Sequence, residues 1–327
     1  MSAGIAGGWQ SNALALRGRL MMRLRGRGGD DEKRLPRTRQ AVLQALCVFI
    51  AFTVLFPIMW VFSLALDPRA LPRPEGLNLI PPGASLRSFI EVIQHPTSNP
   101  IDFLGLAKNS FILAISTALF SVAIGVSAAY AFSRLQFRGR QILMLGILAV
   151  LMLPPVVTIV PLYLQFNQIR LEDVPIFGDV NLRRSLAGVA LAVISGLLPF
   201  AIWNLKGYLD TIPKDLEEAA AVDGATRNQA FRSVILPLAV PALAVTAFLG
   251  FIAGWTEYYF SVIFLSGKVD SYTLAIALNL MVGQFATQTP WSHFAAFAIL
   301  FAAPVSIVYL FLQKYIVSGL AVGGVKG

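Results

Sequence analysis

Apolar residues along the chain gather into six long runs that polar segments separate. A helix of about 20 apolar residues covers the hydrocarbon core of a bilayer, and each run is long enough to do so. The predicted spans are residues 41–66, 111–133, 141–166, 186–205, 238–265 and 294–313. The first run is too long for a removable signal peptide and lacks a small-residue cleavage site. The pattern therefore predicts an all-α polytopic membrane protein with six transmembrane helices.

Composition agrees with a membrane protein. Of the 327 residues, 56% are hydrophobic and 13% are charged, whereas soluble domains carry about 25% charged residues. The net charge of +9 does not indicate nucleic acid, because nine Lys and Arg lie within residues 1–40, directly before the first span. Such a basic tail is typical of cytoplasmic retention and of contact with anionic lipids. We expect membrane lipids as partners and no nucleic acid.

The distribution of Lys and Arg also predicts the orientation. With the amino terminus inside, the cytoplasmic segments hold 18 of these residues and the outer segments hold 8, as the positive-inside rule requires. Both termini are then cytoplasmic, and the protein is expected in the cytoplasmic membrane of a bacterium or archaeon. The segments expected outside are 67–110, 167–185 and 266–293, and the 206–237 loop and the 314–327 tail are expected inside.

Few residues within the spans suggest chemistry. Pro154 and Pro155 near the middle of the third span predict a bend, either beside a translocation path or as a simple packing kink. Glu257 is expected as an acid inside the fifth helix, where a structural hydrogen bond, a substrate contact or interfacial anchoring are the alternatives. The single Cys47 excludes an intrachain disulfide, and with only two His we expect no metal site.

The 206–237 loop has the signals of a helical hairpin. Pro213 suits the first turn of a helix, and the Leu-, Glu- and Ala-rich run that follows favours helix. Gly224 is typical of a helix end. Thr226 and Gln229 have the spacing of a capping box, which predicts a second short helix. Pro237 is expected to stop that helix or to kink its passage into the next span.

This hairpin resembles the EAA loop of ABC importer permeases. The resemblance depends on the residues Glu218, Ala219, Ala220, Asp223, Gly224, Leu236 and Pro237, and Val234 departs from the pattern, which usually has Ile there. It implies the type I ABC importer permease fold with cytoplasmic coupling (EAA) helices. It also implies that a separate ATPase grips this loop.

A second resemblance covers roughly residues 105–327. The segments 271–275, 294–296 and 323–327 are similar to the smaller permease of bacterial maltose/maltodextrin importers. That family implies a second, homologous permease subunit, two ABC ATPase subunits and an extracytoplasmic sugar-binding protein. It implies a docking tail of Gly323, Gly324, Val325, Lys326 and Gly327, although such a Gly-rich end is also typical of a frayed terminus. It implies a loop that enters the binding protein, formed by Gly283, Gln284, Thr287, Gln288 and Pro290.

The sequence carries no nucleotide site of its own. It has no Gly-x4-Gly-Lys-Ser/Thr run, and the segment 267–269 lacks the spacing and the hydroxyl of a phosphate-binding loop. We therefore expect a transport subunit that is not an enzyme and binds no cofactor. ATP and Mg²⁺ are expected on the partner ATPase.

Two other function classes remain open at this point. A secondary sugar transporter predicts intramembrane charge pairs and an inverted repeat, which the sequence does not display convincingly. A membrane scaffold or receptor subunit accounts for the spans but not for the hairpin. Within the importer class, trehalose, other oligosaccharides and a glycerol phosphate are alternative substrates.

Overall fold

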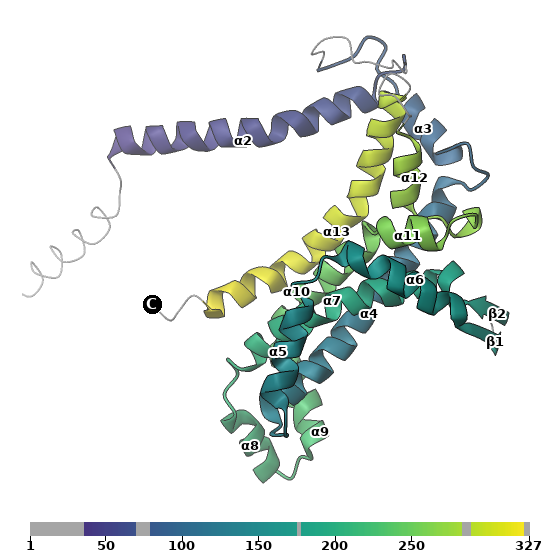
Figure 1. Cartoon of the computed structure of the whole chain (residues 1–327). Helices are drawn as coiled ribbons and strands as arrows, with labels where there is room; N and C mark the ends of the chain where they lie inside the picture. The colour runs from purple at the N-terminus through teal and green to yellow at the C-terminus, as the bar shows by residue number, and fades with distance from the viewer. Residues whose placement is uncertain (1–35, 70–78, 175–177, 283–288, 324–327) are drawn as a thin grey trace, which may run out of the picture. The chain divides into compact units, whose positions relative to one another are not determined.

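The structure is a computed structural model that describes residues 36–69, 79–174, 178–282 and 289–323. The chain divides into two compact units, residues 1–59 and residues 60–327. The described part of the first unit is the helix α2, Arg37–Ala65, whose last residues belong to the second unit. All other described elements belong to the second unit (Figure 1).

The second unit is built mainly of helices. They are α3 (Arg87–Gln94), α4 (Phe103–Arg134), α5 (Arg140–Val150), α6 (Ile159–Gln168), α7 (Leu186–Leu209), α8 (Asp215–Val222), α9 (Arg227–Ala230), α10 (Leu236–Trp255), α11 (Tyr259–Phe264), α12 (Leu274–Leu280) and α13 (Trp291–Gly323). Short 3-10 turns are η1 (Pro155–Thr158), η2 (Leu182–Arg184) and η4 (Val269–Ser271), and η3 (Phe231–Ile235) is a π-helical turn.

Five helices of the described chain are long and apolar enough to cross a membrane. They are Thr38–Ala65, Phe103–Arg134, Leu186–Leu209, Arg227–Trp255 and Trp291–Ile316. Each coincides with one of the predicted spans, so the helical membrane architecture is confirmed. The second span starts at Phe103 and not at residue 111, because the Asp102 side chain caps the helix by accepting a hydrogen bond from the Gly105 N–H at 2.9 Å.

The third predicted span, 141–166, is not one helix. It consists of α5 and α6, which run in different directions in Figure 1 and are joined by a turn and by η1. Pro155 is the first residue of η1, and Pro154 precedes it in extended conformation. A proline cannot donate to the helical ladder and disfavours helical backbone in the residue before it. The predicted bend is therefore present, but two adjacent prolines break the helix completely.

Three further features differ from the prediction. The fifth span, expected over 238–265, is interrupted between the end of α10 at Trp255 and the start of α11 at Tyr259. The last helix, expected over 294–313, continues as α13 to Gly323 through most of the predicted tail. A two-stranded antiparallel sheet, β1 (Arg170–Val174) with β2 (Gly178–Asn181), lies in a segment expected to be a loop. Short strands of this kind have too few residues for a clear period-2 signal.

The core of the second unit includes a tight packing of α4, α7 and α10. Gly125 of α4 lies against α7, since a Cβ built on it would be 3.3 Å from the Ala201 side chain. Gly250 and Gly254 of α10 face α4 even more closely, with built Cβ atoms 2.8 Å and 2.7 Å from the Cα atoms of Ala118 and Ala114. Small residues let helix backbones approach in this way. Another core cluster joins the same helices near α8, with the residues Val126, Ala129, Leu205, Leu209, Ala239 and Ala242.

We expect Gly254→Val to destabilise the protein. The added side chain meets the backbone of α4, which cannot move without separating the two helices, and overpacking of this kind costs about 1–3 kcal/mol. The measurement is the thermal midpoint and the folded yield of the purified protein in detergent. Gly196→Val in α7 is the matched control, because no described atom beyond its chain neighbours and the adjoining backbone of α7 lies within 4 Å of its built Cβ. Equal midpoints for the two variants would contradict the packing described here.

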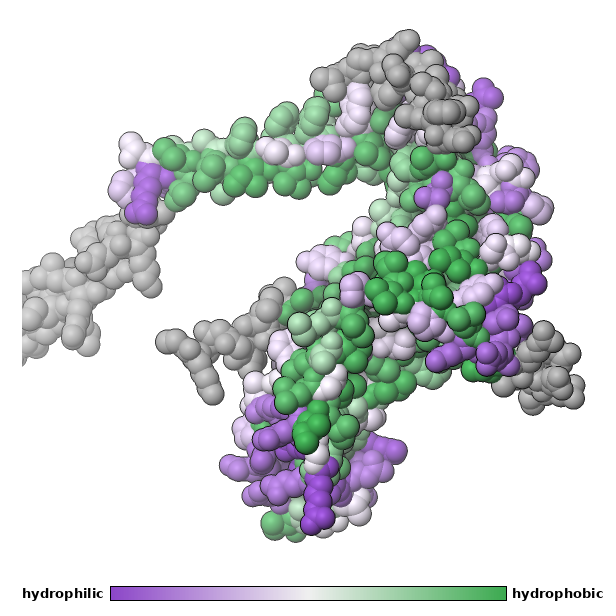
Figure 2. All heavy atoms as spheres, in the orientation of Figure 1, coloured by the Kyte–Doolittle hydropathy of each residue, from purple (hydrophilic) through white to green (hydrophobic). Residues whose placement is uncertain are grey.

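Polar and apolar surfaces of the second unit are separated. Figure 2 shows hydrophilic residues gathered over α8 and α9 at one end, and again over α3 and beyond the end of α6. Hydrophobic residues cover the surface between these two regions. A protein that crosses a bilayer needs this arrangement, because its middle section contacts lipid. The two polar ends are where candidate sites are to be sought.

Candidate functional site

The helix α8 is formed and ended by local signals that the sequence predicted. Its first turn contains the acids Asp215, Glu217 and Glu218, which interact favourably with the positive end of the helix dipole. Gly224 follows the helix with φ of +85°. The N–H groups of Ala225 and Gly224 donate to the carbonyls of Ala220 and Ala221 at 2.9 and 3.1 Å. This is a Schellman motif, and its left-handed residue favours glycine.

The return half of the hairpin also begins as predicted. The Thr226 N–H donates to the Gln229 side chain at 2.7 Å, and the Gln229 N–H donates to the Thr226 hydroxyl at 3.4 Å. This capping box starts α9. The helix does not stop at Pro237, which was one of the two predicted alternatives. The chain continues from α9 through the π-helical turn η3 into α10, and Pro237 is the second residue of α10.

The outer side of α8 is open. No residue of this helix is buried, and Glu218 and Ala219 are exposed. Two apolar side chains are exposed as well, since Val222 is 88% and Leu216 is 43% accessible. An exposed helix with an acid, small alanines and apolar side chains is a surface that another protein can approach closely.

The inner side of α8 is held by polar contacts. The Glu217 carboxylate forms an ion pair with Arg134 at the end of α4 and accepts a hydrogen bond from the Tyr130 hydroxyl at 2.9 Å. These three residues line a cavity of about 430 Å³ between α4 and the hairpin, together with Lys214 and Arg227. The hairpin therefore presents one face outward and fixes the other to α4.

A second polar contact joins the ends of α4 and α7. Asp210, which follows α7, accepts hydrogen bonds from the Ser133 hydroxyl at 2.6 Å and from Lys206 Nζ at 2.5 Å. Burial opposes ionisation of this carboxyl, but the bonds from Lys206 and Ser133 outweigh that effect and hold the pKa of Asp210 below its ordinary value. Asp210 is thus an anion that fixes two helix ends.

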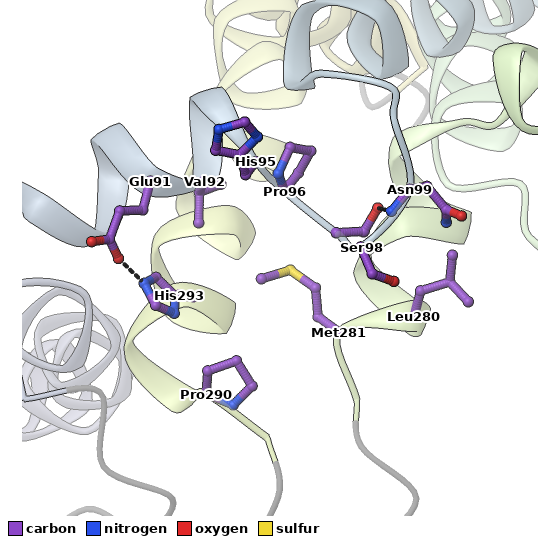
Figure 3. Close-up of a pocket in the computed structure, with 11 residues that line it drawn as sticks. Glu91, Val92, His95, Pro96, Ser98, Asn99, Leu280, Met281, Pro290 and His293 are labelled. Atoms are coloured by element: carbon purple, nitrogen blue, oxygen red, sulfur yellow. Dashed lines mark hydrogen bonds and ion pairs between the residues drawn. The ribbon is translucent and has the colours of Figure 1, made fainter.

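The opposite polar end contains a cavity of about 630 Å³ between α3, α12 and α13 (Figure 3). Glu91 of α3 contacts His293 Nε2 of α13 at 2.5 Å and accepts a hydrogen bond from Arg87 Nε at 2.6 Å. The bond from Arg87, and then that from His293, lower the pKa of the Glu91 carboxyl. Both histidines of the chain, His95 and His293, line this cavity.

The remaining predicted residues are placed as follows. Four of the predicted loop residues lie outside the described residues: Gly283, Gln284, Thr287 and Gln288. Pro290 directly precedes α13 and lines the cavity between α3, α12 and α13. Gly323 is the last residue of α13, and the other predicted tail residues, Gly324, Val325, Lys326 and Gly327, lie outside the described residues.

The sequence predicted that Glu257 lies inside the fifth helix, but in the structure it lies outside any helix. It occupies the interruption between α10 and α11, where its Oε1 accepts a hydrogen bond from the Phe260 N–H at 2.6 Å. A carboxylate in this position satisfies a free donor at the start of α11, in the manner of a helix cap. The apolar residues on both sides of Glu257 give no sign of a break in the helix.

Sequence reasoning did not find Arg134, Tyr130, Asp210, Glu91 or His293. One signal for Arg134 was available in the sequence, because it is a basic residue directly after the predicted span 111–133. Its partner Glu217 is 83 positions away, and only the tertiary structure brings the two together. The Schellman and capping-box residues were found because their partners lie within a few positions.

The fold and the hairpin define a helical membrane protein with an exposed helical hairpin. Residues 121–322 match the family model described as binding-protein-dependent transport system inner membrane component. The chain therefore belongs to this family of multi-pass inner membrane transport components, whose systems depend on a binding protein.

Curated relatives agree with this assignment. The chain is 38% identical over 290 residues to the maltose/maltodextrin transport system permease protein MalG of Yersinia pestis, covering 86% of this chain and 91% of the relative. It is 37% identical over 287 residues to MalG of Escherichia coli strain K12, covering 86% and 94%. The resemblance predicted from the sequence is confirmed.

Solved structures share the fold. A crystal structure of a bacterial ABC transporter involved in the import of the acidic polysaccharide alginate matches with a TM-score of 0.69 at 23% identity, covering 86% of this chain and 99% of that chain. A bacterial alginate ABC transporter in complex with an alginate pentasaccharide-bound periplasmic protein matches with a TM-score of 0.57 at 18% identity, covering 85% and 94%. At these identities the likeness is one of fold, and it agrees with the predicted ABC importer permease.

Proposed function

We propose that this chain is a permease subunit of an ATP-driven importer that moves maltose/maltodextrin-type oligosaccharides across the cytoplasmic membrane. The observation that carries the substrate class is the 38% identity, over 86% of the chain, to a maltose/maltodextrin permease. A binding-protein partner agrees with the family description and with the periplasmic protein in the second alginate structure. The family resemblance further implies a second permease subunit and two ABC ATPase subunits, and it makes the binding protein a sugar-binding protein. Both termini and the hairpin then lie in the cytoplasm, as the excess of Lys and Arg in those segments predicts.

We assign the contact with the ATPase to the open face of α8. Glu218, Ala219 and Val222 are exposed there, whereas Glu217 holds the helix to α4 from the other side. A surface that receives force from a partner must be accessible and also firmly attached to the rest of the chain. The helix α8 meets both conditions, and Asp223, Gly224, Leu236 and Pro237 shape the hairpin that presents it.

The proposed mechanism is alternating access driven by another subunit. Closure of the ATPase dimer on ATP moves the hairpins of the two permeases together and opens the sugar path outward, and hydrolysis reverses the movement. A shift from 1:99 to 99:1 between two states requires about 5.5 kcal/mol of differential binding. This energy comes from ATP bound with Mg²⁺ on the ATPase. The chain's own residues receive the movement and redistribute it among α4, α7 and α10.

Two further contacts with partner proteins are proposed from the family resemblance. Residues 323–327 are proposed to reach between the ATPases, and residues 283–290 to contact the sugar-binding protein. The break at Pro154 and Pro155 is proposed to border the sugar path, because a broken helix exposes backbone groups that a polar path can satisfy.

Reconstitution tests the proposal. The chain is purified with its host's partner permease, ATPase and sugar-binding protein and placed in proteoliposomes, and uptake of radiolabelled maltotriose is measured with and without ATP. We expect uptake only with ATP and binding protein, and slower uptake of trehalose and glycerol 3-phosphate. Uptake that survives omission of the ATPase would instead favour a secondary transporter. Faster uptake of trehalose or of glycerol 3-phosphate would move the substrate assignment to that compound.

A further inference from the structure

The attachment of α8 to the rest of the protein depends on one carboxylate. None of the residues of α8 is buried, so hydrophobic packing of its own side chains does not hold this helix in place. Glu217 is its most enclosed acid, with 16% of the side chain accessible, and its partner Arg134 is only 7% accessible. Both carboxylate oxygens are used, one by Arg134 and the other by the Tyr130 hydroxyl. The link joins positions that lie 83 residues apart in the sequence.

Arg134 makes further contacts from the same guanidinium. Its Nη2 donates to the carbonyl of Ile212 at 2.8 Å, and its Nη1 donates to the Ser133 hydroxyl at 3.2 Å. Ile212 belongs to the connection between α7 and α8 and is itself buried. The planar fork of an arginine can hold several acceptors in a fixed geometry, which a lysine cannot do. One side chain on α4 thus contacts both α8 and the segment that leads into it.

A second arm reaches α7. The Ser133 hydroxyl that accepts from Arg134 donates to Asp210, and Asp210 also binds Lys206 of α7. We define the coupling bracket as the residues Tyr130, Ser133, Arg134, Lys206, Asp210 and Glu217. Through it, the last turn of α4 is bonded to the end of α7 and to the inner side of α8.

The position of the bracket gives it mechanical importance. Directly beyond it, the buried residues Val126, Leu205 and Ala239 join α4, α7 and α10 in one cluster. A displacement imposed at Arg134 therefore acts on three packed helices together. Polar contacts hold only at hydrogen-bond distance, so a movement of α8 either carries α4 with it or breaks these bonds.

We infer that Arg134 and Glu217 are positioning residues that transfer movement of α8 into α4. The inference rests on the proposed function, in which an ATPase moves α8, and it adds the route by which that movement enters the membrane helices. Without the ion pair, α8 remains joined to the membrane helices through its flanking segments and through the single bond from the Tyr130 hydroxyl to Glu217. The ATPase would then move the hairpin without moving α4 to the same extent.

The test measures the coupling ratio, which is the number of sugar molecules imported per ATP hydrolysed, in reconstituted full complexes. We expect Glu217→Gln and Arg134→Gln to assemble and to hydrolyse ATP, with a ratio at least tenfold below wild type. Arg134→Lys keeps the charge but not the fork, and we expect an intermediate ratio. The exchange Arg134→Glu with Glu217→Arg restores opposite charges, and we expect it to recover a substantial part of the lost ratio. Arg138→Gln is the matched control, because Arg138 is exposed in the turn that follows α4, four residues after Arg134.

A distance measurement separates transmission from a merely structural role. Spin labels are placed at Asp215→Cys on α8 and Gln136→Cys after α4, in a Cys47→Ser background, since Cys47 is the single native cysteine. In the otherwise native chain we expect the distance between the labels to be the same with and without ATP, because the two helices move together. In Glu217→Gln we expect ATP to change it by several ångströms.

Each outcome has a defined consequence. If the wild-type complex imports no sugar with ATP, the proposed function fails before the variants are considered. If wild type couples normally and Glu217→Gln keeps the wild-type ratio and a constant label distance, the bracket inference fails and the proposed function stands. If ATP hydrolysis and uptake fall together in proportion to lost complex, the residues stabilise assembly only, and the inference is overturned.

Discussion

Replacement of Gly224 by valine is expected to reduce sugar uptake at least tenfold while leaving the protein inserted in the membrane. Gly224 has φ of +85°, and no described atom beyond its two chain neighbours lies within 4 Å of a built Cβ, so the substitution acts through the backbone and not through a clash. Left-handed backbone costs a residue with a Cβ about 1–2 kcal/mol, and a β-branched residue is a marked outlier there. The chain relieves this strain by unwinding the Schellman turn, which displaces the last residues of α8. Uptake is measured in proteoliposomes that contain the complete transporter.

Gly139→Val is a closely matched control for this substitution. Gly139 has φ of +84° and likewise has no described atom, beyond its chain neighbours, within 4 Å of its built Cβ, but it precedes α5 and lies outside the hairpin. The two variants carry the same backbone strain, and only one of them alters α8. Equal uptake by Gly224→Val and Gly139→Val would show that the shape of the hairpin has no special importance.

The second large effect is expected from Glu218→Lys. The side chain is exposed on the open face of α8, so reversal of its charge leaves the core unchanged. Loss of an acid from the first helical turn costs about 0.3–1 kcal/mol through the helix dipole, which is too little to unfold the hairpin. In the proposed contact, the reversed charge would stand where the ATPase surface receives a carboxylate, and unfavourable pairs of this kind cost several kcal/mol. We expect at least a tenfold loss of uptake, with ATP hydrolysis by the ATPase retained.

Asp215→Lys controls for charge and for the dipole. Asp215 is exposed in the same helical turn, and its substitution changes the net charge by the same amount. We expect it to retain most of the uptake, because the family resemblance places Glu218, and not Asp215, in the contact. If both variants lose uptake equally, the effect belongs to the charge of the helix as a whole and not to Glu218.

Local signals explain what could be predicted from the sequence. The end of α8 at Gly224 and the capping box of Thr226 with Gln229 depend on residues within five positions of one another, and the structure has both. The long apolar runs likewise predicted the helices that carry the fold. Pro154 and Pro155 predicted a bend, but the sequence did not show that α5 and α6 would be separate helices. A complete break depends on whether neighbouring elements can satisfy the backbone groups that it leaves free.

Features that depend on distant residues could not be predicted. The ion pair of Arg134 with Glu217 and the contact of Glu91 with His293 join positions 83 and 202 residues apart. Each of these residues, considered alone, is an ordinary charged or polar residue outside the predicted spans. Glu257 shows the converse error, since apolar neighbours on both sides hid the helix break that it caps.

The central claim is that energy from a separate ATPase enters this chain through the open face of α8. The most direct measurement is labelling of Val222→Cys, in a Cys47→Ser background, with a membrane-impermeant thiol reagent applied to vesicles of known orientation. Val222 is 88% exposed, so its cysteine variant is accessible to the reagent. We expect labelling from the cytoplasmic face only, and protection of Val222→Cys from the reagent when the ATPase is bound. Labelling from the outer face, or an equal rate with and without bound ATPase, would contradict it.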